Sequence, residues 1–131
     1  MPIDVTWDDD TQRVIRWRMS PGFTWDEFDE AVDRSTVLFD SVTHRVDLLV
    51  ISEATIMPSP DAMGPFRRAV TRPLANRNGG YLVLVGVGRV APVLMNVLKT
   101  TIPREQLTFL DVRFYGVEPS ARAFLEHNRQ R

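Results

Sequence analysis

The clearest chemical motif in the chain is the glycine-rich run from Gly86 to Ala91, which reads Gly-Val-Gly-Arg-Val-Ala. It fits the pattern Gly-x-Gly-x-x-Gly/Ala, and it joins an apolar segment typical of a strand to a segment with helical spacing. Glycines at such a turn let a phosphate approach the backbone, and the N-terminus of a helix favours an anion. Gly86, Gly88 and Arg89 are therefore the candidate residues for a phosphate or nucleotide ligand.

The position of this run favours a structural role over a nucleotide site. It lies in a late strand–helix unit, whereas a dinucleotide-binding fold carries the motif in its first unit. The acidic residue roughly twenty positions further on, Glu105, does not follow an expected strand, as a ribose-binding carboxylate would. The run predicts a tight turn, with phosphate binding as the alternative.

The residues needed for thiol, metal or serine catalysis are absent from the sequence or lack the required spacing. The chain has no cysteine, which excludes thiol catalysis, disulfides and thiolate metal sites. Its 2 histidines, His44 and His127, lack the spacing of metal ligands. The sequence also has no Gly-x-Ser-x-Gly element for a serine nucleophile. We therefore expect no enzyme activity, no bound metal and no cofactor.

The charge of the chain is nearly balanced, with 16 basic and 17 acidic residues and a net charge of −1. Nucleic-acid-binding proteins usually carry a basic excess, so we expect no nucleic-acid partner. Four arginines gather on or after the second expected helix: Arg67, Arg68, Arg72 and Arg77. They form either a patch for phosphate or an acidic partner, or, as we favour, a solvent-facing helix surface.

The length of 131 residues predicts a single domain covering 1–131. The longest apolar stretches are too short to cross a bilayer, so we expect no membrane span. The chain also shows no basic start followed by an apolar core, and this pattern predicts a cytoplasmic protein.

Hydrophobic periodicity predicts an α/β fold with the element order β-β-α-β-α-β-α-β-α. Residues 3–7 and 15–19 alternate as in a hairpin, and the capping box from Thr24 to Glu27 starts a helix that runs to Asp40. Later apolar runs predict strands at 46–51, 81–85 and 112–115. They also predict helices at 90–98 and 119–127 and a second helix after the 52–61 loop, with Met63, Phe66 and Val70 on one face. The sheet is expected to be mixed and mainly parallel, with the N-terminal β-hairpin joined to parallel strands.

Two local questions stay open in this pattern. Ser59 caps the second helix with Pro60 at the first position, or Asp61 caps it and places Pro65 in the first turn. We favour Asp61, because a start at Ser59 leaves Pro65 in the helix interior. Residues 104–110 form either a short helical turn or an extended approach to the last strand.

Several segments together resemble one protein family. These are Phe-Thr-Trp-Asp-Glu-Phe at 23–28, His-Arg-Val-Asp-Leu-Leu-Val at 44–50, Leu-Val-Leu-Val-Gly at 82–86 and the Leu-Met-Asn-Val helix at 94–97. They resemble the SpoIIAA-like group, which is related to STAS domains, the anti-sigma-factor antagonists, and has been linked to lipid-carrying CRAL-TRIO-type domains. The resemblance covers nearly the whole chain in element order and implies a single bacterial regulatory domain of STAS/SpoIIAA-like fold.

In true antagonists the loop after the central strand carries Asp-Ser-Ser-Gly, and the serine after the aspartate is phosphorylated. Residues 56–61 take that place here, and Ser59 matches the phosphorylated serine. Pro58 replaces the aspartate and Pro60-Asp61 replaces Ser-Gly, which alters the kinase recognition site. A phosphate at Ser59 would still find a helix N-terminus nearby. The resemblance implies that the 52–61 loop and the next helix select a partner, through Ser59, Pro58, Asp61, Met63 and Arg67.

We therefore expect a non-enzymatic regulatory or binding domain that acts on a protein partner or a small ligand. One alternative is a carrier of a lipid or small hydrophobic ligand, with a pocket between the sheet and the helices lined by Met57, Met63, Phe66 and Leu94. The other is the nucleotide or phosphate site at Gly86 and Gly88. The sequence leaves open a homodimer formed through the hairpin edge or a helix face.

Overall fold

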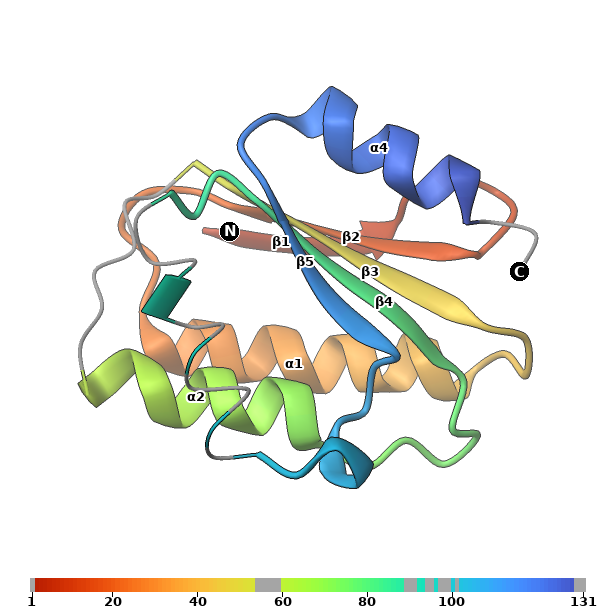
Figure 1. Ribbon diagram of the computed structural model, residues 1–131, viewed down its shortest axis with the longest axis horizontal. Helices are drawn as coiled ribbons and strands as arrows, with labels where there is room; N and C mark the ends of the chain where they lie inside the picture. The colour runs from red at the N-terminus through yellow and green to blue at the C-terminus, as the bar shows by residue number, and fades with distance from the viewer. Residues whose placement is uncertain are drawn as a thin grey trace.

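The computed structural model describes residues 2–53, 60–88, 92, 93, 96, 100 and 102–128. Within them one sheet has the strand order β1-β2-β3-β4-β5 (Figure 1). Only β1 and β2 pair antiparallel, and the other neighbours pair parallel. The predicted α/β fold, with a mixed and mainly parallel sheet that begins with a hairpin, is confirmed. The strands are β1 (Ile3–Trp7), β2 (Val14–Met19), β3 (Val46–Ser52), β4 (Gly79–Val85) and β5 (Asp111–Tyr115).

The helices with described bounds are α1 (Trp25–Asp40), α2 (Pro60–Thr71) and α4 (Glu118–His127). A short 3-10 turn at Arg104–Gln106 shows that the ambiguous stretch 104–110 begins with a helical turn. The third expected helix, at 90–98, falls largely outside the described residues.

The strand order decides which helices cover which face of the sheet. Each parallel connection moves one strand further in the same direction. Because such crossovers are right-handed, their helices must lie on one face. Figure 1 shows α1 and α2 side by side below the sheet and α4 above it. Helix α4 follows the last strand and makes no crossover, which leaves it free to cover the opposite face.

The start of α1 is the local feature that the sequence predicted best. The Glu27 backbone N–H donates to the Thr24 hydroxyl at 3.1 Å, and the Thr24 N–H donates to the Glu27 carboxylate at 2.9 Å. This reciprocal capping box satisfies two of the N–H groups that a helix start leaves without partners. The boundaries Trp25–Asp40 agree with the prediction.

The preferred start of the second helix is wrong. Helix α2 begins at Pro60, and Pro65 lies inside it. Proline suits the first helical position, where no N–H is needed, and this favours Pro60 as the start. Pro65 removes one hydrogen bond to the preceding turn. Because Pro65 is buried, burial of its ring offsets part of that loss.

Two apolar layers lie on the two faces of the sheet. All 7 residues of β3 are buried, as expected for a strand covered on both sides. The larger layer lies between the sheet and α1 and α2, and the smaller one lies under α4. The smaller layer is centred on β3, β4 and α4, and Val14 at the start of β2 and Tyr115 of β5 pack against it. Its buried members are Leu49, Ile51, Val83, Val85, Ala121 and Leu125.

Candidate functional site

Gly86, the first residue of the glycine run, directly follows the end of β4. Gly86 has a φ of +79°, and a Cβ there would lie 2.5 Å from the carbonyl oxygen of Ser52. Its N–H donates to the Tyr115 carbonyl at 3.1 Å. Chain packing therefore requires glycine at this position without any ligand. Gly88 also has a positive φ, of +55°, and Arg89 lies outside the described residues.

The arginine cluster is divided between two roles. Arg68 donates to Asp29 at 2.9 Å, and Arg72 pairs with Asp33, so both connect α2 to α1. Arg67 is exposed on α2. Arg77 is exposed beyond the end of α2, with a φ of +50°. The arginines do not converge on one point, which agrees with the solvent-facing surface that we favoured.

Most of the loop that the family resemblance singled out cannot be compared with the structure. Pro58 and Ser59 lie outside the described residues. Asp61 and Met63 belong to α2, but their side chains are outside the described part. The partner-binding prediction at this loop therefore stays a prediction.

The two histidines lie on separate elements. His44 is exposed before β3, with Nε2 at 2.7 Å from the Gln12 carbonyl, and His127 is exposed in the last turn of α4. Among the described residues no three His, Cys, Asp or Glu side chains come together as metal ligands would. No described helix is long and apolar enough to cross a membrane.

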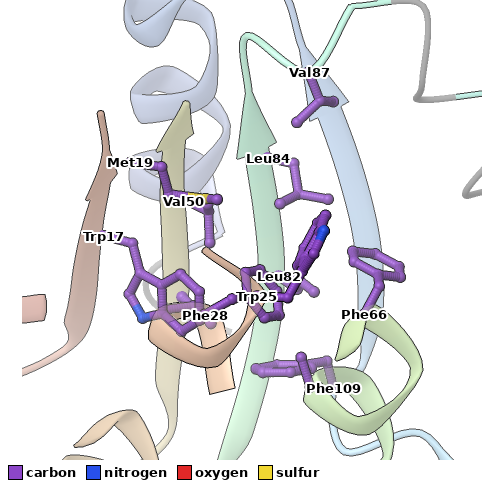
Figure 2. Close-up of a pocket in the computed structure, with 12 residues that line it drawn as sticks. Trp17, Met19, Trp25, Phe28, Val50, Phe66, Leu82, Leu84, Val87 and Phe109 are labelled. Carbon is purple, nitrogen blue, oxygen red and sulfur yellow. The ribbon is translucent and has the colours of Figure 1, made fainter. Parts of the chain in front are cut away.

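An apolar pocket lies between the sheet and helices α1 and α2. Figure 2 shows its side chains pointing toward one another from the strands and from both helices. Phe66, one of the four residues predicted to line such a pocket, does so, while the side chains of Met57, Met63 and Leu94 are outside the described part. The lining consists of Trp17, Met19, Trp25, Phe28, Leu48, Val50, Phe66, Ala69, Leu82, Leu84, Val87 and Phe109.

Aromatic rings in edge-to-face contact form one wall of this pocket. The Phe28 ring centroid lies 5.3 Å from those of both Trp17 and Trp25. Such pairs stabilise beyond the area they bury. The Trp17 Nε1 donates to the Ser35 hydroxyl at 2.6 Å, so the indole is held in place by a buried hydrogen bond as well as by packing.

The pocket is small. Its volume is about 40 Å³. Since a water-sized group needs roughly 10–15 Å³, there is room for about three such groups without any side chain moving. All described lining residues are buried except Trp25 and Ala69, which are partly exposed. We call the part of the lining formed by Trp25 on α1 and Ala69 on α2 the mouth of the pocket.

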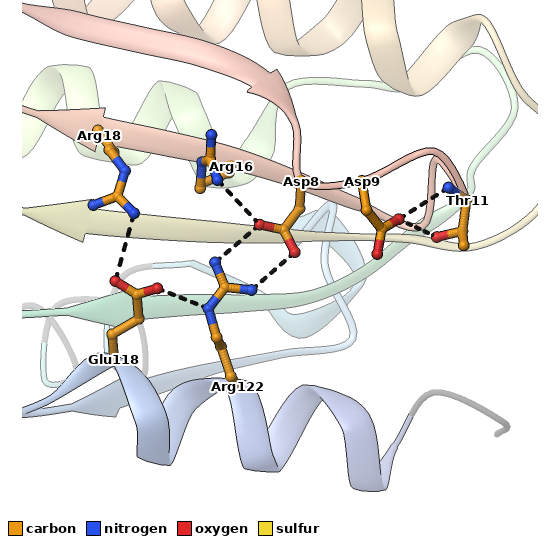
Figure 3. A network of polar contacts seen from close by, with 7 residues as sticks. All are labelled: Asp8, Asp9, Thr11, Arg16, Arg18, Glu118 and Arg122. Carbon is orange, nitrogen blue, oxygen red and sulfur yellow. Dashed lines mark hydrogen bonds and ion pairs between the residues drawn. The ribbon is translucent and has the colours of Figure 1, made fainter.

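A larger and polar groove lies on the other side of the molecule, between α4, the β1–β2 turn and the start of β3. Its volume is about 950 Å³. At one side Arg122 donates two hydrogen bonds of 2.9 Å to Asp8 and one of 2.7 Å to Glu118 (Figure 3). These bonds raise the pKa of Arg122. Arg16 and Arg18 of β2 complete the network, at 3.5 Å from Asp8 and 3.7 Å from Glu118.

The groove also contains a buried carboxylate, Asp47 of β3, which is 4% exposed. Burial raises the pKa of its carboxyl, while the Tyr81 N–H, which donates at 2.8 Å, and Arg45, at 3.6 Å, act in the opposite direction. Arg45 also donates to the Asn128 carbonyl at 2.6 Å. The charged groups of Asp8, Asp47, Arg45 and Arg122 therefore hold the turn, the sheet and α4 together.

Sequence reasoning did not identify the residues that dominate these two regions. Trp17 and Trp25 were interpreted as a strand residue and a helix-start residue, and their alternation and capping signals say nothing about a shared pocket. Asp8 and Arg122 are far apart in the chain, so no local spacing could have joined them. Arg122 is not among the four arginines that the sequence pattern singled out, and no local pattern shows which arginine is paired.

Comparisons with known proteins give no match: no family model fits the sequence, and no curated protein and no solved structure is significantly similar to it.

Proposed function

We propose that this protein is a non-enzymatic binding domain that takes a small hydrophobic ligand in the pocket between the sheet and helices α1 and α2. The observation that carries the proposal is the lining of that pocket, whose described side chains are apolar or aromatic and are partly exposed at the mouth. Ligand pockets are mostly apolar and lie between packed elements. Its small volume means that a ligand must displace the side chains at the mouth.

Helix α2 is the element that connects the pocket to the protein surface. Phe66 and Ala69 line the pocket, while the neighbouring Arg67 is exposed. A ligand that moves the wall formed by Phe66 and Ala69 also moves the surface that carries Arg67. This arrangement supports the regulatory role that the SpoIIAA/STAS resemblance implies, in which a protein partner binds α2 in one of its two positions.

The polar groove and the glycine turn support a function less well. The charged groups of the groove are already engaged in ion pairs and hydrogen bonds that hold α4 in place. Gly86 is required by the close approach of Ser52. Both features have structural explanations, whereas the unfilled space beside the aromatic wall has none.

Native mass spectrometry of the protein purified from its own host tests the proposal. We expect a small adduct that is retained under native conditions and lost on denaturation. Substitution Ala69→Leu adds apolar bulk at the mouth, and it should reduce the adduct by at least half, since overpacking competes with the ligand. The same spectrum reports a covalent phosphate, which peptide mapping would assign to Ser59 or to another residue.

Ala123→Leu is the matched control, because Ala123 is also a helical alanine but lines the polar groove. This variant should keep the adduct of the original protein. Loss of the adduct in both variants would contradict the assignment to the apolar pocket. A bare mass, together with a melting temperature that does not respond to added ethylbenzene, would overturn the proposed function, because a ligand of the native state must stabilise it.

A further inference from the structure

We infer that the ligand is a neutral molecule with an apolar body and a single hydrogen-bond acceptor, which the Trp25 indole N–H binds at the mouth. The inference rests on the proposed function and assigns the chemical class of ligand to the pocket. It also excludes a fatty-acid anion or another carboxylate as the preferred occupant. Two features of the described residues support it.

The first feature is that the described lining offers no charge. None of the described residues that line the pocket is acidic or basic. A carboxylate taken into such a lining would lose its hydration without gaining a counter-ion, at a cost far above that of a neutral group. The body of the ligand must therefore be apolar.

The second feature is the supply of hydrogen-bond donors. Among the described lining side chains only Trp17 and Trp25 carry an N–H group. The Trp17 N–H donates to Ser35 at 2.6 Å and is therefore already used. Figure 2 shows the Trp25 indole among the other lining side chains, with its nitrogen on the side of Leu84 and Phe66. The described lining thus offers the Trp25 N–H as a donor, which matches a ligand with one acceptor.

Three probes of similar size separate these properties: ethylbenzene has no acceptor, acetophenone has one, and benzoate is charged. Binding is measured by isothermal titration calorimetry on the intact protein. We expect acetophenone to bind about five-fold more tightly than ethylbenzene, which corresponds to one net hydrogen bond. Benzoate should bind at least about ten-fold more weakly than acetophenone.

Trp25→Phe removes the N–H and keeps an aromatic ring against Phe23 and Phe28. In this variant acetophenone should bind only as tightly as ethylbenzene, while the affinity for ethylbenzene stays within about two-fold of the original. Trp7→Phe is the matched control, because Trp7 is a half-buried tryptophan outside the pocket lining. It should retain the five-fold preference of the original protein.

The outcomes separate the two proposals. If none of the three probes binds the original protein, the proposed function itself fails. If benzoate binds as tightly as acetophenone, or if ethylbenzene equals acetophenone, the pocket binds ligands but the inferred ligand class is wrong. If Trp25→Phe keeps the preference for acetophenone, another donor is responsible and the role of Trp25 is overturned. Should that variant fail to fold, the ranking of the three probes on the original protein still decides the ligand class.

Discussion

The two faces of the sheet are stabilised in different ways, although the same strands form both. Toward α1 and α2, the strands β1 and β2 direct Ile3, Ile15 and Trp17 into one continuous apolar layer. Toward α4, the same two strands direct polar side chains, among them Arg16 and Arg18, which pair with Asp8 and Glu118. The buried residues of the apolar layer on the α4 face come from β3, β4 and α4, and Val14 is the β2 residue that packs against them.

The same strand can therefore pack through apolar contacts on one face and through ion pairs and hydrogen bonds on the other. Apolar contacts are non-directional and tolerate small shifts of a helix, so the α1–α2 face can contain a pocket and remain stable. Ion pairs and hydrogen bonds have directional geometry and weaken steeply when misaligned. We therefore expect the α4 face to fix the position of its helix more strictly. Its contribution to the free energy of unfolding should depend on salt and pH, whereas that of the pocket face should depend on the volume of the buried side chains.

The largest effect should follow a change on the pocket face. Trp17→Ala removes a side chain that is 2% exposed and leaves the Ser35 hydroxyl without its donor. We expect the free energy of unfolding to fall by about 4 kcal/mol, from the cavity and the lost transfer energy together. Urea denaturation measures this loss, which should be the same at low and high salt. A loss that shrinks with salt would contradict the distinction between the faces.

A smaller effect should follow a change on the α4 face. Arg122→Ala removes three hydrogen bonds, two to Asp8 and one to Glu118. Because the Arg122 side chain is 38% exposed, we expect a loss of only about 1–2 kcal/mol at low salt and less at high salt. The control is Arg68→Ala on the other face, whose pair with Asp29 is more exposed and should contribute less than about 0.5 kcal/mol. Equal losses of stability in the two variants would show that the Arg122 network contributes no more than an exposed ion pair.

The smallest effect is a pH dependence of stability on the α4 face. Burial raises the folded-state pKa of Asp47 above the ordinary value of 3.8, so the folded protein binds this proton more tightly than the unfolded chain does. The resulting stability is complete below the unfolded pKa and is lost as the pH rises through the folded pKa.

Asp47→Asn removes this titration and keeps an oxygen that can accept from the Tyr81 N–H. The stability of the original protein relative to the variant should therefore fall as the pH rises above 3.8 through the acidic range. Chemical denaturation of both proteins at several pH values measures the difference. A difference that does not change with pH, or one that rises, would show that burial does not dominate the titration of Asp47.

The predictable parts of the fold are those that nearby residues encode. The capping box of Thr24 and Glu27 fixed the start of α1, since both partners lie within one turn. Alternation along β1 and β2 predicted the hairpin, whose register places Asp4 opposite Arg18. The start of α2 was predicted wrongly. The sequence shows that Pro65 costs the helix a backbone hydrogen bond, but it does not show that Pro65 is buried and that this burial offsets part of the cost.

The candidate site was far less predictable than the fold. Phe66 was expected to line a pocket because of its place on a helix face, and it does so. Trp17, Trp25 and Phe109 come from three separate elements, and no spacing relates them. The α4 network has the same character, since Asp8 and Arg122 are 114 residues apart.

The sequence by itself determined the element types, the hairpin register, the capped helix α1 and the mixed α/β class, because hydrophobic period, capping and turn chemistry act over a few residues. Tertiary structure alone decided that α4 covers the face opposite α1 and α2, that Gly86 must be glycine because of Ser52, and that two tryptophans share one apolar pocket. These outcomes depend on which surfaces meet when the sheet is assembled. The contacts are long-range, and their free energies arise only once distant residues have been brought together.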